Sequence, residues 1–110
     1  MAHSSLLLKF SKKMAELVSE NKEYILSKQL LRSGTAVGAL IREAEFAQSK
    51  KDFIHKMSIS LKEANETLYW IDLLKDTNYI NKTQYKTHFS LNKELVAMLV
   101  SSIKTSKSKL

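Results

Sequence analysis

Apolar residues recur near the start of the chain at the three- and four-residue spacing of an α-helix. At about 100° per residue, one side of residues 6–19 is apolar and the other carries Lys9, Lys12, Lys13 and Glu16. The apolar side consists of Leu6, Leu7, Phe10, Met14, Leu17 and Val18. This pattern predicts an amphipathic helix over residues 6–19, and the polar run of residues 19–23 ends it.

The same spacing resumes in residues 26–47 and again in residues 50–75, which predicts two further helices. The second stripe consists of Leu26, Leu30, Ser33, Val37, Leu40, Ile41 and Ala44. The third consists of Phe53, Met57, Leu61, Ala64, Leu68 and Ile71. Ser49 followed by Asp52 resembles a capping box at the start of the third helix, with a short acid in place of the usual Glu.

A fourth helix is predicted for residues 82–104, because Asn81 with Gln84 three residues later gives another capping signal. Its apolar stripe consists of Tyr85, His88, Leu95, Val96, Leu99 and Ile103. Residues 105–110 are rich in Ser and Lys, and we expect a basic flexible tail there. Four amphipathic helices with short connections favour a single domain, residues 1–104, with an all-α fold: an antiparallel up-and-down four-helix bundle.

Composition supports helices and excludes several classes of protein. The 110 residues include no Pro and only two Gly, whereas all-β folds need turn residues every ten or so positions. Cys is absent, which excludes disulfides, thiol nucleophiles and thiolate-bound metals. No apolar run is long enough to span a bilayer and no signal peptide is recognisable, so we expect no membrane association and a cytoplasmic location.

Positive charge is concentrated near the C-terminal end. The net charge is +7, and residues 81–110 contain six Lys and a single acidic residue, Glu94. On a helical wheel four of these lysines fall within about 40° of one another. The row consists of Lys82, Lys86, Lys93 and Lys104, continued by Lys107 and Lys109. Such a row attracts phosphate backbone by counterion release without reading sequence; the alternative is a solvated lysine face that favours solubility.

The third helix carries a second seam on the side away from its core stripe. It consists of Ile59, Glu63, Glu66, Trp70 and Leu73. An exposed Trp beside aliphatic side chains is unusual on a monomer, which favours burial against another subunit. The alternative is a squat bundle whose end is covered by Trp70.

Both glycines, Gly34 and Gly38, lie four residues apart inside the second helix. Each costs about 1 kcal/mol there relative to Ala. We therefore expect them to let another helix approach closely, and we assign them to the same oligomer interface as the Trp70 seam.

The sequence of the second and third helices resembles a known family. The segments are QLLRSGTAVGALIREA (29–44), AQSKKDF (47–53) and KEANETLYW (62–70). They are similar to bacterial four-helix-bundle proteins first noticed as products of intervening sequences in large-subunit ribosomal RNA genes. Ala36 and Leu40 depart from the family pattern, where Ser and Asn are common, and are expected to add apolar contact in place of that polar pair.

This resemblance implies a ring-shaped homopentamer of up-and-down bundles. The implied relative is the accessory protein of diversity-generating retroelements, which binds nucleic acid and a reverse transcriptase. No enzymatic activity goes with the family.

The residue pattern does not indicate an active site, a metal site or a cofactor. His3, His55 and His88 include no two at a metal-binding spacing on one helix. His88 and Asn92 share the apolar side of the fourth helix, four residues apart, and are interpreted as a polar pair that fixes helix register.

Only three acids are candidates for catalysis by paired carboxylates: Glu43, Glu63 and Glu66. Glu43 and Glu66 equally fit structural pairing with Arg32, Arg42 or Lys62 across a subunit contact. The leading hypothesis is therefore a non-catalytic homo-oligomer that binds RNA or DNA backbone as an accessory to a nucleic-acid enzyme, with no small-molecule substrate. The rival is a scaffold that binds only protein.

Overall fold

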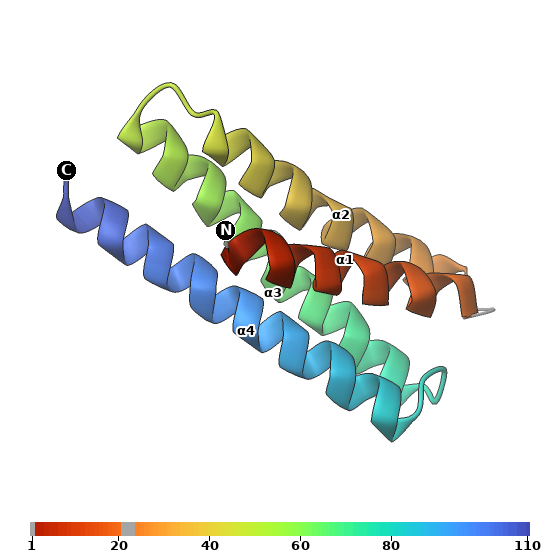
Figure 1. The fold of residues 1–110 in the computed structure, drawn as a ribbon. Helices are drawn as coiled ribbons and strands as arrows, with labels where there is room; N and C mark the ends of the chain where they lie inside the picture. Colours follow the sequence, from red (N-terminus) through yellow and green to blue (C-terminus); the bar gives the residue numbers. More distant parts are fainter. Residues whose placement is uncertain (1, 21–23) are drawn as a thin grey trace.

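Four α-helices account for nearly all of the chain in the computed structural model, which describes residues 2–20 and 24–110 (Figure 1). They are α1 (Ala2–Glu20), α2 (Ile25–Glu45), α3 (Lys50–Asp76) and α4 (Lys82–Ser108). The described residues include no strand. The fold class is therefore all-α, with four helices packed against each other.

Each helix packs against two others around a shared core. α1 contacts α2 and α4, α2 also contacts α3, and α3 also contacts α4. The bundle measures 45 × 21 × 21 Å. Figure 1 shows the α2–α3 connection and the C-terminus at one end and the α3–α4 connection at the other.

The predicted apolar stripes supply the core. Its largest fully buried apolar side chains from these stripes are Phe10, Leu30, Val37, Ile71, Leu95 and Leu99. Leu74 of α3 is also fully buried, although the sequence pattern placed it outside the core stripe. Burial of one such side chain stabilises the fold by about 1.5–3 kcal/mol relative to its exposure. Because the stripes of all four helices converge, the charged residues remain on the outside.

Small polar side chains join α2 to α3 inside this core. The Thr67 hydroxyl donates to the Ser33 hydroxyl at 2.8 Å, and the Ser60 hydroxyl donates to the Val37 carbonyl at 3.0 Å. Ser33, Ser60 and Thr67 are fully buried. Their small size allows the two helices to approach closely, and the hydrogen bonds satisfy polar groups that would be costly to bury unpaired.

Both predicted N-caps are present, and the one at the start of α4 forms a full capping box, whereas the Asp52 carboxylate at the start of α3 accepts from the Gln48 backbone N–H. The Ser49 hydroxyl accepts a hydrogen bond from the Asp52 backbone N–H at 3.0 Å. Asn81 and Gln84 form a reciprocal capping box, with distances of 2.8 and 2.9 Å. Each cap satisfies backbone donors that have no partner within the helix, which fixes where α3 and α4 begin.

Helix ends without a cap signal differ from the sequence prediction. α1 begins at Ala2, and α2 ends at Glu45. The largest correction concerns residues 105–110: α4 continues through Ser108, so the expected flexible tail is mostly helical. The Lys50 ammonium group donates to the Lys109 carbonyl at 3.2 Å, which ties this last turn to the start of α3.

Within the described residues, none of the helices has a segment long and apolar enough to cross a membrane.

Candidate nucleic-acid interface

The lysine row predicted from the sequence lies on α4 and its C-terminal cap. Lys82, Lys86, Lys93, Lys104 and Lys107 belong to the helix, Lys109 is the C-cap residue, and all six are exposed. Because α4 is continuous from Lys82 to Ser108, the first five share one rigid element. At 1.5 Å per residue, Lys82 and Lys107 lie about 37 Å apart along the helix axis.

Few groups compete for these lysines. Within the described part of the chain, the ion pairs engage Lys13, Arg32 and Lys56, and none engages the α4 row. The Lys93 ammonium group lies 5.4 Å from the centre of the Phe89 ring, within the range of a cation–π contact. The row therefore presents positive charge that internal carboxylates do not neutralise.

Acidic side chains occur beside the first turn of α4. The Tyr85 hydroxyl donates to an Asp72 carboxylate oxygen at 2.8 Å, and this hydrogen bond raises the pKa of Tyr85 above its ordinary value of 10.0. Lys75 lies 4.4 Å from the centre of the Tyr85 ring. The first turn of α4 therefore lies beside charges of both signs, Asp72 and Asp76 together with Lys75.

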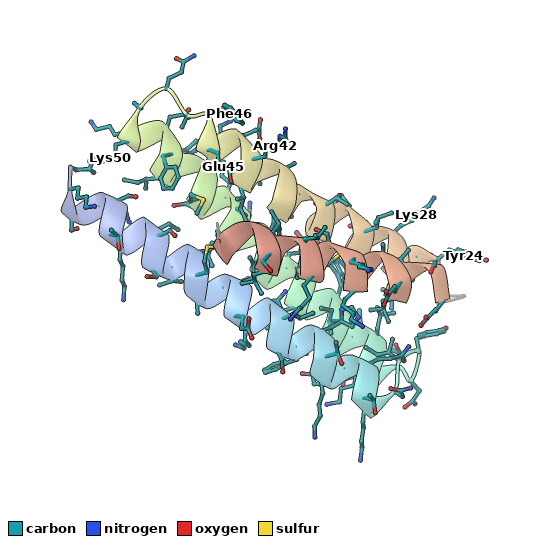
Figure 2. The ribbon with its side chains drawn as sticks, in the orientation of Figure 1. Tyr24, Lys28, Arg42, Glu45, Phe46 and Lys50 are labelled. Atoms are coloured by element: carbon teal, nitrogen blue, oxygen red, sulfur yellow. The ribbon has the colours of Figure 1, made fainter. Side chains whose placement is uncertain are left out.

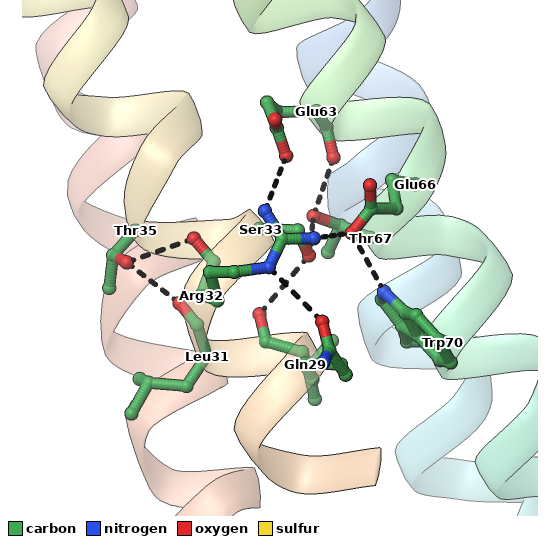
Figure 3. Close-up of polar contacts among 10 residues, drawn as sticks. Gln29, Leu31, Arg32, Ser33, Thr35, Glu63, Glu66, Thr67 and Trp70 are labelled. Carbon is green, nitrogen blue, oxygen red and sulfur yellow. Dashed lines mark hydrogen bonds and ion pairs between the residues drawn. The ribbon is translucent and has the colours of Figure 1, made fainter.

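The Trp70 seam on α3 is joined to α2 by a polar network (Figure 3). Arg32 forms ion pairs with Glu63, at 3.4 Å, and with Glu66. Its Nε donates to the Gln29 side chain at 3.1 Å, and the Trp70 indole N–H donates to Glu66 at 3.0 Å. Both carboxylates of the seam are therefore paired within one chain, whereas the sequence left open whether Arg32 belonged to another subunit.

The apolar members of the seam are only partly exposed. Ile59, Trp70 and Leu73 are half-buried, and Trp70 packs against the core cluster. The apolar area that this seam offers to a second subunit is thus smaller than it would be if Trp70 were fully exposed.

The assignment of Gly34 to an oligomer interface needs correction. Gly34 is buried, and a Cβ at this position would overlap the end of the Met14 side chain of α1. A Cβ on Gly38 would lie 3.7 Å from Leu7, also on α1, which is ordinary contact. The helix that approaches the glycines is therefore α1 of the same chain, and the wheel position alone did not identify it.

The buried polar residues of α4 also differ from their predicted arrangement. The Asn92 amide donates to the Ala64 carbonyl of α3 at 3.1 Å, while its oxygen accepts no hydrogen bond in the described structure. Its predicted pairing with His88 is not among the hydrogen bonds of the described residues. Asn92 thus links the register of α4 to that of α3. Burial lowers the pKa of His88; the charge of Lys13 lowers this pKa further, and the charge of Glu16 raises it.

The remaining candidate sites have structural explanations. Glu43 pairs with Lys56 of the same chain at 3.8 Å. The described residues contain no group of three or more His, Asp or Glu placed to hold a metal ion. His3 lies outside the residues whose side chains the structure describes.

Among the exposed apolar side chains of the described residues, Leu8 and Phe46 were not singled out from the sequence. Leu8 is 69% exposed. Phe46, the C-cap of α2, is 76% exposed and is labelled in Figure 2. Leu8 follows Leu6 and Leu7, and three consecutive helical residues cannot all face one core. Leu8 lines an open groove between α1 and α2 with a volume of about 340 Å³, together with Gly38 and Arg42.

The chain is similar to known proteins over nearly its whole length. A family model described as 23S rRNA-intervening sequence protein matches residues 3–101. A crystal structure from Bacteroides thetaiotaomicron VPI-5482, described as a protein with unknown function from the S23 ribosomal protein family, is 48% identical, with a TM-score of 0.87. The match covers 93% of this chain and 98% of that chain. No curated protein matches.

Proposed function

Because the chain belongs to the 23S rRNA-intervening sequence protein family, we propose that it is a non-catalytic, oligomeric helical protein that binds nucleic-acid backbone through the basic surface of α4. The observation that carries this proposal is the exposed lysine row, which is free of ion pairs within the described residues. When unpaired lysines on a rigid helix contact phosphates, they displace the counterions condensed on the nucleic acid, and this release favours binding at low salt.

The binding surface is expected to be sequence-independent. Lys contacts a phosphate as a point charge, and phosphate contacts carry no direct sequence information. Unrelated RNA and DNA of equal length and strandedness should therefore bind with similar affinity, and affinity should fall steeply as salt rises. Fluorescence anisotropy with several unrelated oligonucleotides over a salt series tests this; tight binding that ignores salt, or discrimination among sequences, would contradict it.

The assembly belongs to the same proposal: an antiparallel up-and-down bundle whose copies form a ring-shaped homopentamer in the cytoplasm. A ring repeats the lysine row in every subunit and thereby multiplies the number of phosphate contacts. Support comes from the Trp70 seam on α3, where the half-buried side chains of Ile59, Trp70 and Leu73 keep apolar surface that a second copy could cover.

The second candidate function is a scaffold that binds only protein, including a nucleic-acid enzyme as partner. The exposed side chains of Leu8 and Phe46 favour it, since large apolar groups at a surface commonly mark protein contacts. Under this alternative the lysines serve solubility, and wild-type protein shows no nucleic-acid binding at low salt.

A further inference from the structure

A second pair of lysines lies on the outer side of α3, the helix that packs beside α4, between the residues of α3 that contact α2 and those that contact α4. Lys51 and Lys62 lie on α3, eleven residues apart, and both are exposed. Eleven residues are close to three full turns, so the two side chains point within about 20° of one another. Lys93 and Lys104 on α4 are also eleven residues apart and exposed.

The contacts between α3 and α4 place these two pairs at matching heights. Ala64 is bonded to Asn92, Asp72 to Tyr85 and Lys50 to Lys109. Residue numbers therefore rise along α3 as they fall along α4, and the two helices lie side by side over their length (Figure 1). At this register Lys62 falls near the level of Lys93, and Lys51 near the level of Lys104.

The result is a rectangle of four lysines on the α3–α4 face. Its long side is about 16 Å, from eleven residues at 1.5 Å each, and its short side is set by two packed helices, whose axes lie about 8–10 Å apart.

The facing sides of the two helices carry uncharged residues between these corners. On a helical wheel they are Ser58 and Leu61 on α3, and Val96 and Val100 on α4. Glu94 follows Lys93 in the sequence but lies about 100° farther around α4. That places Glu94 on the side opposite Asn92, the residue that contacts α3.

The carboxylates of α3 nearest the rectangle have partners outside it. Asp52 follows Lys51 but lies about 100° farther around α3, and it accepts a hydrogen bond from the Gln48 backbone N–H at 3.4 Å. Glu63 and Glu66 pair with Arg32 on the α2 side. Asp72, bonded to Tyr85, lies beyond Lys62, toward the other end of the bundle. The four lysines therefore border a surface with little competing negative charge.

We infer that α3 supplies a second row of phosphate contacts, so that a nucleic-acid strand lies along the α3–α4 face between Lys51 and Lys62 on one helix and Lys93 and Lys104 on the other. The inference rests on the proposed function and deepens it, because it names α3 residues that a one-helix stripe leaves out. The long side of the rectangle covers about five phosphates of one strand at 3.4 Å each.

Removal of the α3 pair tests this inference. Lys51→Gln with Lys62→Gln keeps good helix formers at exposed positions, so the protein should stay folded. Binding of a short mixed-sequence DNA, as a single strand and as a duplex, is measured over a salt series. Removal of one phosphate-binding lysine should lower the slope of log affinity against log salt by about one, and the double variant should lower it by about two.

The matched control is Lys9→Gln with Lys12→Gln, which removes the same charge from exposed positions on α1. It should leave the slope close to wild type. Equal reductions of slope in both double variants would overturn the inference, because net charge alone would then explain the effect. A gain-of-charge variant adds an independent readout: Ser58→Lys, between the α3 lysines, should steepen the slope by about one.

Failure of this inference is distinguishable from failure of the proposed function. An unchanged slope in Lys51→Gln/Lys62→Gln, with a shallower slope in Lys86→Gln/Lys93→Gln, would confine binding to α4 and overturn the two-helix face. Absence of wild-type binding to either form of DNA at low salt would overturn both.

Discussion

Gly34 and Gly38 lie on the α1 side of α2, but the space that each one meets differs. At Gly38 a methyl group reaches ordinary contact with Leu7, whereas at Gly34 it overlaps Met14, a side chain that is buried in the core. Gly38→Ala should therefore raise the free energy of unfolding by up to about 1 kcal/mol through helix propensity. At Gly34 the same gain is offset by displacement of Met14.

We expect Gly34→Ala to be less stable than Gly38→Ala by about 1 kcal/mol or more. Chemical denaturation of both variants at one protein concentration measures the difference. Equal stabilisation at both positions would show that Met14 moves aside at no cost.

His88 is expected to make stability depend on pH. Burial lowers the pKa of the folded-state imidazole below its ordinary value of 6.5, so the unfolded chain binds the proton more readily. The contribution of His88 to the free energy of unfolding is fully present above pH 6.5, the ordinary pKa of His. It is lost as the pH falls toward the folded-state pKa, by at most about 1.4 kcal/mol per pH unit.

Urea denaturation between neutral pH and about pH 5 measures this loss, and His88→Gln should reduce the dependence. The control is His55→Gln, which alters an exposed imidazole on α3. Equal pH dependence in wild type and His88→Gln would assign the effect to other groups.

Among the elements, α2 and α3 share an ion-pair network centred on Arg32. Arg32 neutralises Glu63, whose side chain is only 17% exposed, as well as Glu66. Arg32→Gln leaves two neighbouring carboxylates without their cation and should cost about 1 kcal/mol of stability.

Arg42→Gln is the matched control, because Arg42 lies on the same helix, is exposed and takes part in no ion pair of the described residues. Its effect should stay within about 0.5 kcal/mol. Thermal or urea unfolding of both variants decides; equal effects would mean that the Arg32 network contributes little.

The starts of α3 and α4 were predictable because a cap is local: Ser49 meets Asp52, and Asn81 meets Gln84, three residues away. The end of α4 was not, since its last turn is tied to Lys50, which lies 59 residues from Lys109 in the chain. The same limit applies to the sites. The helical wheel placed the α4 lysines in one row and Trp70 beside Glu66. It did not show that Arg32 of the same chain pairs with Glu66, or that Met14 of the same chain packs against Gly34.

At the scale of the whole molecule, a single bundle leaves apolar surface at several places, including Leu8, Phe46 and the α3 seam. We therefore expect light scattering at micromolar concentration to give a mass several times that of the 12.6 kDa chain, with five copies as the proposed number. Trp70→Ala should weaken this assembly. A particle of one chain mass would contradict the oligomer, and a stable assembly with another number of copies would exclude the pentamer.

The central claim is that the lysine row of α4 binds nucleic-acid backbone, and the salt dependence of Lys86→Gln/Lys93→Gln tests it most directly. Both positions are exposed, so the substitution removes two charges and leaves the apolar side of α4 intact. The predicted result is a folded protein whose slope of log affinity against log salt is shallower than wild type by about two. A wild type that does not bind at low salt, or a double variant with an unchanged slope, would contradict the claim and favour the protein scaffold.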